Sequence, residues 1–235
     1  MSMTTGFVAR GATAGSVSRR YQVFIPAAWS AEQKWPVVLF LHGAGERGDD
    51  GVVQTTVGIG PAIQKATGRF PCLVVLPQCQ RNASWNSPPM QEHALQAMTD
   101  VISQMNGDEE RLYLTGISMG GYGTWDLAAR QPGRFAALAP ICGGIYRPYG
   151  TGSRGIIRET MRRIGKTPVW VFHGGADEIV PVTESRQAVE ALKAVGGDVR
   201  YTEYTGVGHN SWDPAYAEPE LMTWMLGKRR LTTDH

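Results

Sequence analysis

Residues 116–120 read GISMG, and this stretch lies between two different sequence patterns. The apolar run Leu112–Leu114 precedes it, and residues 122–130 after it carry apolar side chains at helical spacing. A serine on a sharp strand-to-helix turn has its hydroxyl pushed clear of the backbone, and glycines beside it let the turn form without a steric clash. This context predicts that Ser118 is a nucleophile.

Short apolar runs bounded by turn residues predict strands, and helical spacing follows most of the later runs. The expected strands are 21–25, 37–41, 72–76, 112–114, 135–141, 169–172 and 199–204, and the expected helices are 90–105, 122–130, 182–195 and 216–226. Strands that alternate with helices indicate an α/β fold with a mostly parallel central sheet flanked by helices. We expect the first one or two strands, which precede any helix, to pair antiparallel at one edge.

The composition sets limits on the partners. A chain of 235 residues and 25.6 kDa suits a single domain over residues 1–235. The net charge of +2 comes without a concentrated basic face, and Lys228–Arg230 at the end of the last helical pattern suits the helix dipole, so we expect no nucleic-acid partner. No apolar stretch is long enough to span a membrane, and residues 1–10 lack the apolar core of a signal peptide. We therefore expect a cytoplasmic protein with no membrane partner, and the oligomeric state stays open.

Three cysteines, Cys72, Cys79 and Cys142, are an odd number without metal-type spacing. A complete disulfide framework is excluded. Cys72 and Cys142 lie in apolar runs and are expected to be buried thiols, whereas Cys79 follows a strand end. We expect no metal site and no cofactor.

In a parallel sheet the ligand site forms beyond the carboxyl ends of the strands. Three of these positions carry Ser118, Asp177 and His209, in that chain order. Serine is a weak nucleophile that needs a base to take its proton, and a histidine base needs an acceptor that fixes its tautomer. The three residues are thus a candidate catalytic triad. Glu178 stands beside Asp177, and chemistry alone does not separate these two acids.

Four segments together carry a family resemblance: HGAGERG at 42–48, GISMGGYG at 116–123, HGGAD at 173–177, and GH at 208–209. They resemble the α/β-hydrolase superfamily, and more narrowly its small phospholipase/carboxylesterase and dienelactone-hydrolase-like branch, which includes prolyl-oligopeptidase-like esterases and peptidases. The resemblance extends from about Tyr21 to Leu226. It implies an α/β-hydrolase fold and favours Asp177 as the acid of the triad.

The resemblance also implies an oxyanion hole made by the backbone N–H groups of Ala44 and Met119. Backbone donors aimed at a developing oxyanion stabilise the transition state. His42 and His173 each begin a His-Gly turn at a strand end, where we expect the ring to brace a loop. Glu46 and Arg47 are expected to pair with each other or with the opposite loop.

The connection at 145–166 is too short and too polar for a lipase-type apolar lid, so we expect no large lid domain and a preference for short-chain or small aryl esters. Trp85, Trp212 and Tyr122 are candidate substrate contacts, with loop packing as the alternative for the two tryptophans. The sequence as a whole predicts a serine hydrolase of small carboxylic esters that forms an acyl-enzyme on Ser118. The alternatives are a serine peptidase of prolyl-oligopeptidase-like type and a non-catalytic ligand-binding protein of the same fold.

Overall fold

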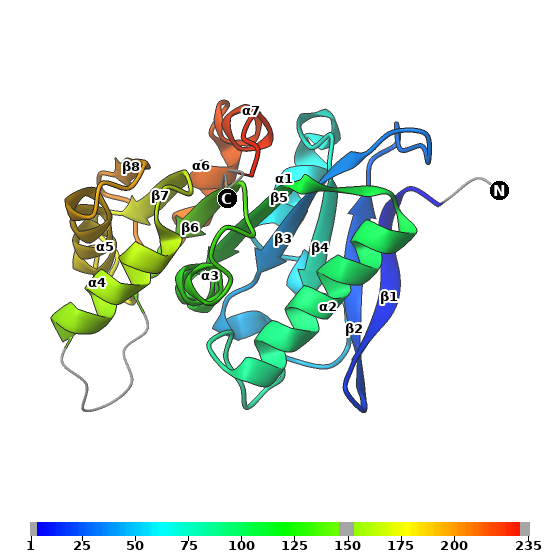
Figure 1. Ribbon diagram of the computed structural model, residues 1–235, viewed down its shortest axis with the longest axis horizontal. Helices are drawn as coiled ribbons and strands as arrows, with labels where there is room; N and C mark the ends of the chain where they lie inside the picture. Colours follow the sequence, from blue (N-terminus) through cyan, green and yellow to red (C-terminus); the bar gives the residue numbers. More distant parts are fainter. Residues whose placement is uncertain (1–3, 146–152, 231–235) are drawn as a thin grey trace, which may run out of the picture.

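The computed structural model describes residues 4–145 and 153–230, and its centre is one eight-stranded sheet (Figure 1). The strands are β1 (Gly6–Ala14), β2 (Val17–Ile25), β3 (Trp35–Leu41), β4 (Leu73–Pro77), β5 (Gly107–Ile117), β6 (Ala137–Ile141), β7 (Val169–Gly174) and β8 (Val199–Tyr204). The helices are α1 (Ile59–Lys65), α2 (Pro88–Gln104), α3 (Met119–Arg130), α4 (Ser153–Ile164), α5 (Thr183–Ala194), α6 (Trp212–Ala217) and α7 (Leu221–Leu226). Three single-turn 3-10 helices, η1 (Ala44–Glu46), η2 (Val53–Thr55) and η3 (Thr67–Arg69), lie in loops.

The strand order is β1-β2-β4-β3-β5-β6-β7-β8. From β4 to β8 every neighbouring pair is parallel, whereas β2 pairs antiparallel with both β1 and β4. Strands β3, β4, β6 and β7 are buried at every residue, as expected for parallel strands covered on both faces. The predicted α/β fold with an antiparallel edge is confirmed.

Helices cover both faces of the sheet and divide the core into two clusters (Figure 1). Apolar side chains of α2, α3, α4 and α5 pack on one face, and those of α1, α6 and α7 pack on the other. Burying one large aliphatic or aromatic side chain contributes roughly 1.5–3 kcal/mol, so these two layers hold the strand ends in place.

The structure contains three elements that the apolar pattern does not predict. Strand β1 is an edge strand of small and polar residues, and much of it is exposed. Helix α1 is short, and α4 is strongly polar except for the half-buried Ile156 and for Ile157, Met161 and Ile164, which are buried along one side. The predicted lid-free connection at 145–166 is therefore mostly the helix α4, while residues 146–152 lie outside the described part of the chain.

The single helix predicted over 216–226 is wrong. Two short helices occupy this stretch, and α6 ends at Ala217 before Glu218, whose backbone is extended (φ −54°, ψ 119°). Pro219 follows, and a proline disfavours helical geometry at the residue before it. Among the described residues, no helix combines the length and apolar character needed to cross a membrane.

Candidate active site

Ser118 lies on the one-residue turn between β5 and α3. Its backbone has φ 52° and ψ −116°, which a residue with a side chain rarely adopts and which costs about 1–3 kcal/mol. The turn is held from both sides, because the Ser118 N–H donates to the carbonyl of Ile141 (3.0 Å) and the Tyr122 N–H donates to the carbonyl of Ser118 (3.1 Å). A strained serine at the head of a helix is the geometry that the GISMG stretch predicts.

The glycines on either side of this turn are required by close backbone approach. A Cβ on Gly120 would collide with the carbonyl of Leu41, and a Cβ on Gly116 would collide with the carbonyl of Gly120. Both contacts are with backbone, which cannot move aside without shifting β3 or α3. The turn can therefore pack against the sheet only with glycine at these two positions.

The structure brings Ser118, Asp177 and His209 together from three separate loops. The Nε2 atom of His209 lies 2.9 Å from Oγ of Ser118, and its Nδ1 lies 2.7 Å from Oδ2 of Asp177. The carboxylate of Asp177 is fully buried, whereas the ring of His209 is 21% exposed. Glu178, the other candidate acid, is exposed to solvent. The geometry thus selects Asp177 as the partner of His209.

The carboxylate of Asp177 is fixed at both oxygens. Its Oδ1 accepts hydrogen bonds from the N–H groups of Ile179 and Val180, each at 2.9 Å. Burial alone raises the pKa of this carboxyl, but the hydrogen bonds from His209, Val180 and Ile179 outweigh it and hold the pKa below its usual value. Asp177 is therefore ionised at neutral pH and can accept the N–H of His209.

Ala44 and Met119, the predicted oxyanion donors, occupy equivalent positions. Ala44 is the first residue of η1 and Met119 is the first residue of α3. The N–H of a first helical residue has no acceptor within its own helix, so both groups can donate to a ligand.

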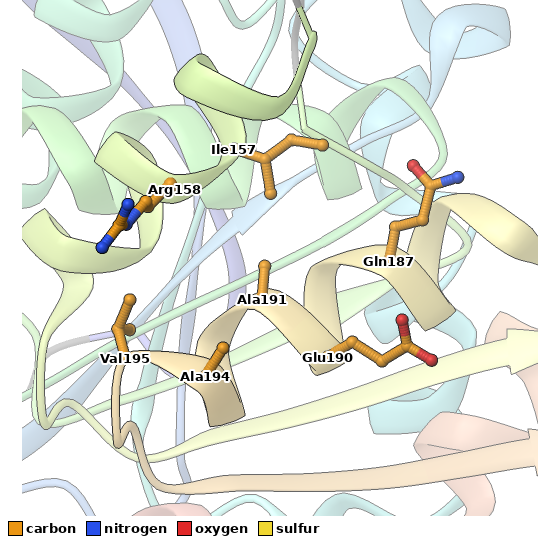
Figure 2. Close-up of a pocket in the computed structure, with 7 residues that line it drawn as sticks. All are labelled: Ile157, Arg158, Gln187, Glu190, Ala191, Ala194 and Val195. Atoms are coloured by element: carbon orange, nitrogen blue, oxygen red, sulfur yellow. The ribbon is translucent and has the colours of Figure 1, made fainter.

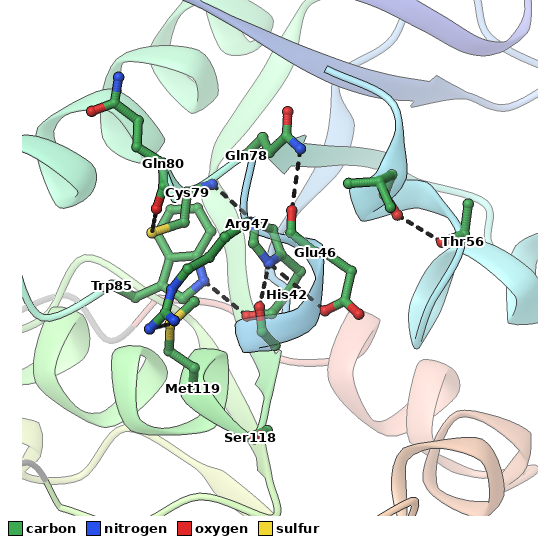
Figure 3. A network of polar contacts seen from close by, with 12 residues as sticks. His42, Glu46, Arg47, Thr56, Gln78, Cys79, Gln80, Trp85, Ser118 and Met119 are labelled. Atoms are coloured by element: carbon green, nitrogen blue, oxygen red, sulfur yellow. Dashed lines mark hydrogen bonds and ion pairs between the residues drawn. The ribbon is translucent and has the colours of Figure 1, made fainter. Parts of the chain in front are cut away.

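The loop that carries Ala44 is braced by His42, as predicted (Figure 3). Burial lowers the pKa of His42 to about 4, so the ring is neutral. Its Nε2 accepts from the N–H of Cys79 (2.9 Å), which leaves Nδ1 to donate to the carbonyl of Gly43 (2.6 Å). The indole of Trp85 donates to the carbonyl of His42 at 2.9 Å. These bonds fix the chain immediately before Ala44.

The position of Trp85 corrects a prediction. Its side chain is 0% exposed and stands edge-on to the ring of His42, with ring centroids 5.0 Å apart. Since no part of Trp85 reaches the surface, its role is to pack behind the loop, and it is no wall of the substrate site. This is the loop-packing alternative.

Trp212 and Tyr122 lie beside the triad. The ring of Trp212 is half-buried at the start of α6, edge-on to His209 with centroids 5.4 Å apart. Tyr122 is half-buried in the first turn of α3, one turn after Ser118. Both remain candidate substrate contacts.

Glu46 and Arg47 do not pair with each other among the described residues. A guanidinium nitrogen of Arg47 lies 2.9 Å from the sulfur of Met119, next to the nucleophile. The backbone carbonyl of Glu46 accepts from Gln78 (3.1 Å), and its carboxylate turns back toward its own loop, 3.9 Å from Nδ1 of His42. Figure 3 shows Arg47 reaching from this loop toward Met119. Arg47 thus joins the loop of Ala44 to the turn of Met119, which is the cross-loop role expected of it, whereas the carboxylate of Glu46 stays with its own loop.

Sequence reasoning did not place Cys142 at the site. The Sγ atom of Cys142, a carboxylate oxygen of Asp177 and a ring nitrogen of His209 all lie within 4.8 Å of one another. Burial raises the pKa of this thiol to about 12, and Asp177 and His209 are already bonded to each other. The thiol therefore packs beneath the triad as a small neutral group. The sequence signal that could have placed Cys142 at the site is its position directly after the strand that becomes β6. In the structure its φ of 39° turns the chain at this point.

A separate groove of about 610 Å³ lies between α4 and α5 (Figure 2). Its lining residues are Ile157, Arg158, Gln187, Glu190, Ala191, Ala194 and Val195. None of them belongs to the triad or to the loops around it.

The comparison with known families agrees with this geometry. Residues 81–217, more than half of the chain and including the triad, match the model of the dienelactone hydrolase family. The chain belongs to this family. Membership in the dienelactone hydrolase family confirms the resemblance given by the sequence motifs.

Several relatives of this dienelactone hydrolase family member are esterases by name. A solved structure of a thermostable esterase superposes with a TM-score of 0.82 at 35% identity, covering 95% of this chain and 63% of that one. A carboxylesterase of Arabidopsis thaliana is 24% identical over 74% of this chain and 82% of its own length. An uncharacterized secreted protein of Arthroderma benhamiae is 28% identical over 75% of this chain, which spans 21% of that protein.

Proposed function

We propose that this protein hydrolyses small carboxylic esters through an acyl-enzyme on Ser118. The observation that carries the proposal is the unbroken hydrogen-bond chain from Ser118 through His209 to the ionised, buried Asp177. The esterase relatives support the choice of bond, and the strained turn supports the choice of nucleophile.

In the first half-reaction His209 takes the proton of Ser118 as the Oγ atom attacks the ester carbonyl carbon. The carbonyl oxygen becomes an oxyanion, which accepts hydrogen bonds from the N–H groups of Ala44 and Met119. Asp177 stabilises the imidazolium. His209 then gives its proton to the departing alkoxide, so that an alcohol leaves and the acyl group stays on Ser118.

In the second half-reaction water replaces the alcohol. His209 takes a proton from the water, the resulting hydroxide attacks the acyl carbon, and the proton returns to Oγ of Ser118 as the carboxylic acid leaves. Each of the two backbone donors contributes about 3–4 kcal/mol to stabilising the oxyanion in both steps. The chemistry needs no further group.

The preference for short-chain or small aryl esters rests on α4. This helix buries Ile157, Met161 and Ile164 in the core, so its apolar side is not available to cover a long acyl chain. The half-buried ring of Trp212 stands against His209 and limits the space beside the reacting carbon. We therefore infer an open and shallow site, which favours small acyl groups.

A cytoplasmic location is also part of the proposal. Cys72, Cys79 and Cys142 are free and buried, which suits a reducing compartment. Detection of the protein in the culture medium of its source cells, rather than in the soluble cell extract, would overturn it.

The activity is tested with a panel of p-nitrophenyl esters run beside aminoacyl p-nitroanilides. The proposal expects turnover of the esters at rates at least a hundredfold above those of the anilides, and no loss of activity in EDTA. Faster cleavage of the anilides would identify a peptidase. No turnover of either series, with the fold intact by circular dichroism, would identify a non-catalytic member of the fold.

A further inference from the structure

A second histidine lies against the acid of the triad. His173, the penultimate residue of β7, is fully buried, and its Nε2 is 3.2 Å from Oδ2 of Asp177. This is the same oxygen that Nδ1 of His209 approaches at 2.7 Å. Asp177 therefore has one oxygen shared by two imidazole rings.

The surroundings of His173 determine where its proton lies. Its Nε2 also lies 2.9 Å from the carbonyl oxygen of Val180. Both neighbours of Nε2 are oxygens that can only accept, since Asp177 is ionised, so Nε2 carries the proton of the ring. Nε2 donates this proton to the carbonyl of Val180, the nearer acceptor, and shares it with Oδ2 of Asp177 as a second, longer contact. The opposite tautomer would place a lone pair against a carboxylate and a carbonyl.

Ser185 holds the other side of the ring. Its hydroxyl lies 2.6 Å from Nδ1 of His173 and 3.2 Å from the carbonyl of Gly143. A hydroxyl has one proton, and because the ring proton of His173 lies on Nε2, Nδ1 can only accept, so the hydroxyl donates to Nδ1. Burial lowers the pKa of His173, so the ring is neutral and Nδ1 is free to accept. Ser185 is itself fully buried in α5.

We propose that His173, held by Ser185, is a positioning residue for the triad: it shares its Nε2 proton between the carbonyl of Val180 and Oδ2 of Asp177, and this contact helps to fix the carboxylate that orients His209. The inference rests on the proposed function of the triad. It adds two residues to the hydrogen-bonded chain behind Asp177, His173 of β7 and Ser185 of α5. His173 touches no substrate in this arrangement and acts through Asp177.

The arrangement has a consequence that simple loop bracing lacks. A carboxylate that accepts a hydrogen bond from His173 attracts the protonated ring of His209 less strongly than a carboxylate without that hydrogen bond. Removing the donor therefore stabilises protonated His209 and moves the acid limb of the pH–rate profile upward. Among the described residues, the polar and titratable groups near the two rings are Asp177, Cys142, Ser118 and, from β8, Glu203, whose carboxylate is paired with Arg186 of α5. Each of these stays the same when only His173 is changed.

Three variants separate positioning from packing. His173→Gln keeps an N–H donor within reach of the Nε2 position, and His173→Leu has a similar size without a donor. Ser185→Ala removes the hydroxyl that bonds Nδ1 and leaves the ring in place. The matched pair at position 173 differs in the donor, and both members are uncharged.

The experiment measures kcat, KM and the pH–rate profile with p-nitrophenyl acetate, and in parallel the titration of the His209 ring by NMR in a Ser118→Ala background. For His173→Leu we expect kcat to fall roughly tenfold or more, the size of one lost hydrogen bond to a charged group, with KM within about twofold. The midpoint of both titrations should rise by about half a pH unit or more. His173→Gln should stay within about threefold of the wild type, and Ser185→Ala should fall between the two.

Equal profiles for His173→Leu and His173→Gln would overturn the proposal, and so would a fall in kcat without movement of either midpoint. If His173→Leu does not fold, Ser185→Ala decides, and an unchanged kcat and midpoint in that variant would overturn the proposal. The NMR titration does not depend on turnover. A wild-type protein without esterase activity would therefore refute the proposed function while the role of His173 was still measured.

Discussion

Oδ2 of Asp177 lies 2.7 Å from Nδ1 of His209, while the neighbouring acid Glu178 points to solvent. Adjacent carboxylates thus have different environments, because the turn after β7 directs one inward and the other outward. The backbone N–H groups of Ile179 and Val180 hold Oδ1 of Asp177 and leave Oδ2 for the histidines.

This difference gives a matched test of the acid. Asp177→Asn keeps the shape of the side chain but places an amide against His209, and we expect kcat to fall roughly 10³- to 10⁴-fold. His209→Ala should cost at least as much, since it removes the base. Glu178→Gln is the control and should stay within about twofold of the wild type. A larger loss in Glu178→Gln than in Asp177→Asn would mean that the acid is assigned to the wrong residue.

The oxyanion donor at Ala44 can be removed without removing a side chain. Ala44→Pro lacks the N–H, and proline suits this first helical position because Gly43 before it is extended (φ −76°, ψ −174°). We expect kcat to fall about 10²- to 10³-fold, as for the loss of one oxyanion donor. Ala44→Gly retains the N–H and serves as control. Equal activity of the two variants would show that Ala44 does not donate to the transition state.

Buried histidines make the fold sensitive to acid: burial lowers the pKa of His173, and it lowers the pKa of two others further. Burial lowers the pKa of both His42 and His93 to about 4, below their ordinary value of 6.5. The unfolded chain therefore binds protons that the folded chain does not, and stability decreases as the pH falls from about 6.5 toward 4. The loss is on the order of 3 kcal/mol for each group. In thermal melts between pH 7 and 4.5, His93→Leu should show a smaller fall in Tm than the wild type. An equal fall in Tm in the wild type and in His93→Leu would show that His93 does not contribute to the acid sensitivity.

The acyl-chain preference tests whether α4 offers no apolar cover to the site and whether Trp212 limits the space for the acyl group. Each methylene that becomes buried contributes about 0.8 kcal/mol, and one that meets an aromatic wall contributes nothing. We expect kcat/KM to peak between acetyl and butyryl p-nitrophenyl esters. Trp212→Ala should move the peak toward longer chains. A steady rise in the wild type through decanoyl esters would show a long apolar groove and contradict the proposed preference.

The position of the candidate triad could be predicted because its signals are local. Ser118, Asp177 and His209 each follow an apolar strand run, and parallel strands bring their carboxyl ends to one edge of the sheet. The need for glycine around Ser118 could also be predicted, because these glycines belong to the same short motif. The structure gives the physical reason, since the carbonyl of Leu41 approaches Gly120 too closely for any other residue.

The remaining features depend on tertiary packing. The sequence does not show which way the ring of Trp85 turns, because the direction is set by the carbonyl of His42, far away in the chain. The only sign of the contact between His173 and Asp177 in the sequence is the four-residue spacing of these two residues. Helix α4 was missed because its polar majority hides the buried spacing of Ile157, Met161 and Ile164.

The most direct test of the central claim is active-site labelling with a fluorophosphonate, followed by peptide mapping. We expect one probe per chain, attached to Ser118, with complete loss of p-nitrophenyl acetate hydrolysis. The Ser118→Ala variant should fold as the wild type does, take up no probe and show no turnover. Labelling at another serine, or turnover retained in Ser118→Ala, would contradict an acyl-enzyme on Ser118.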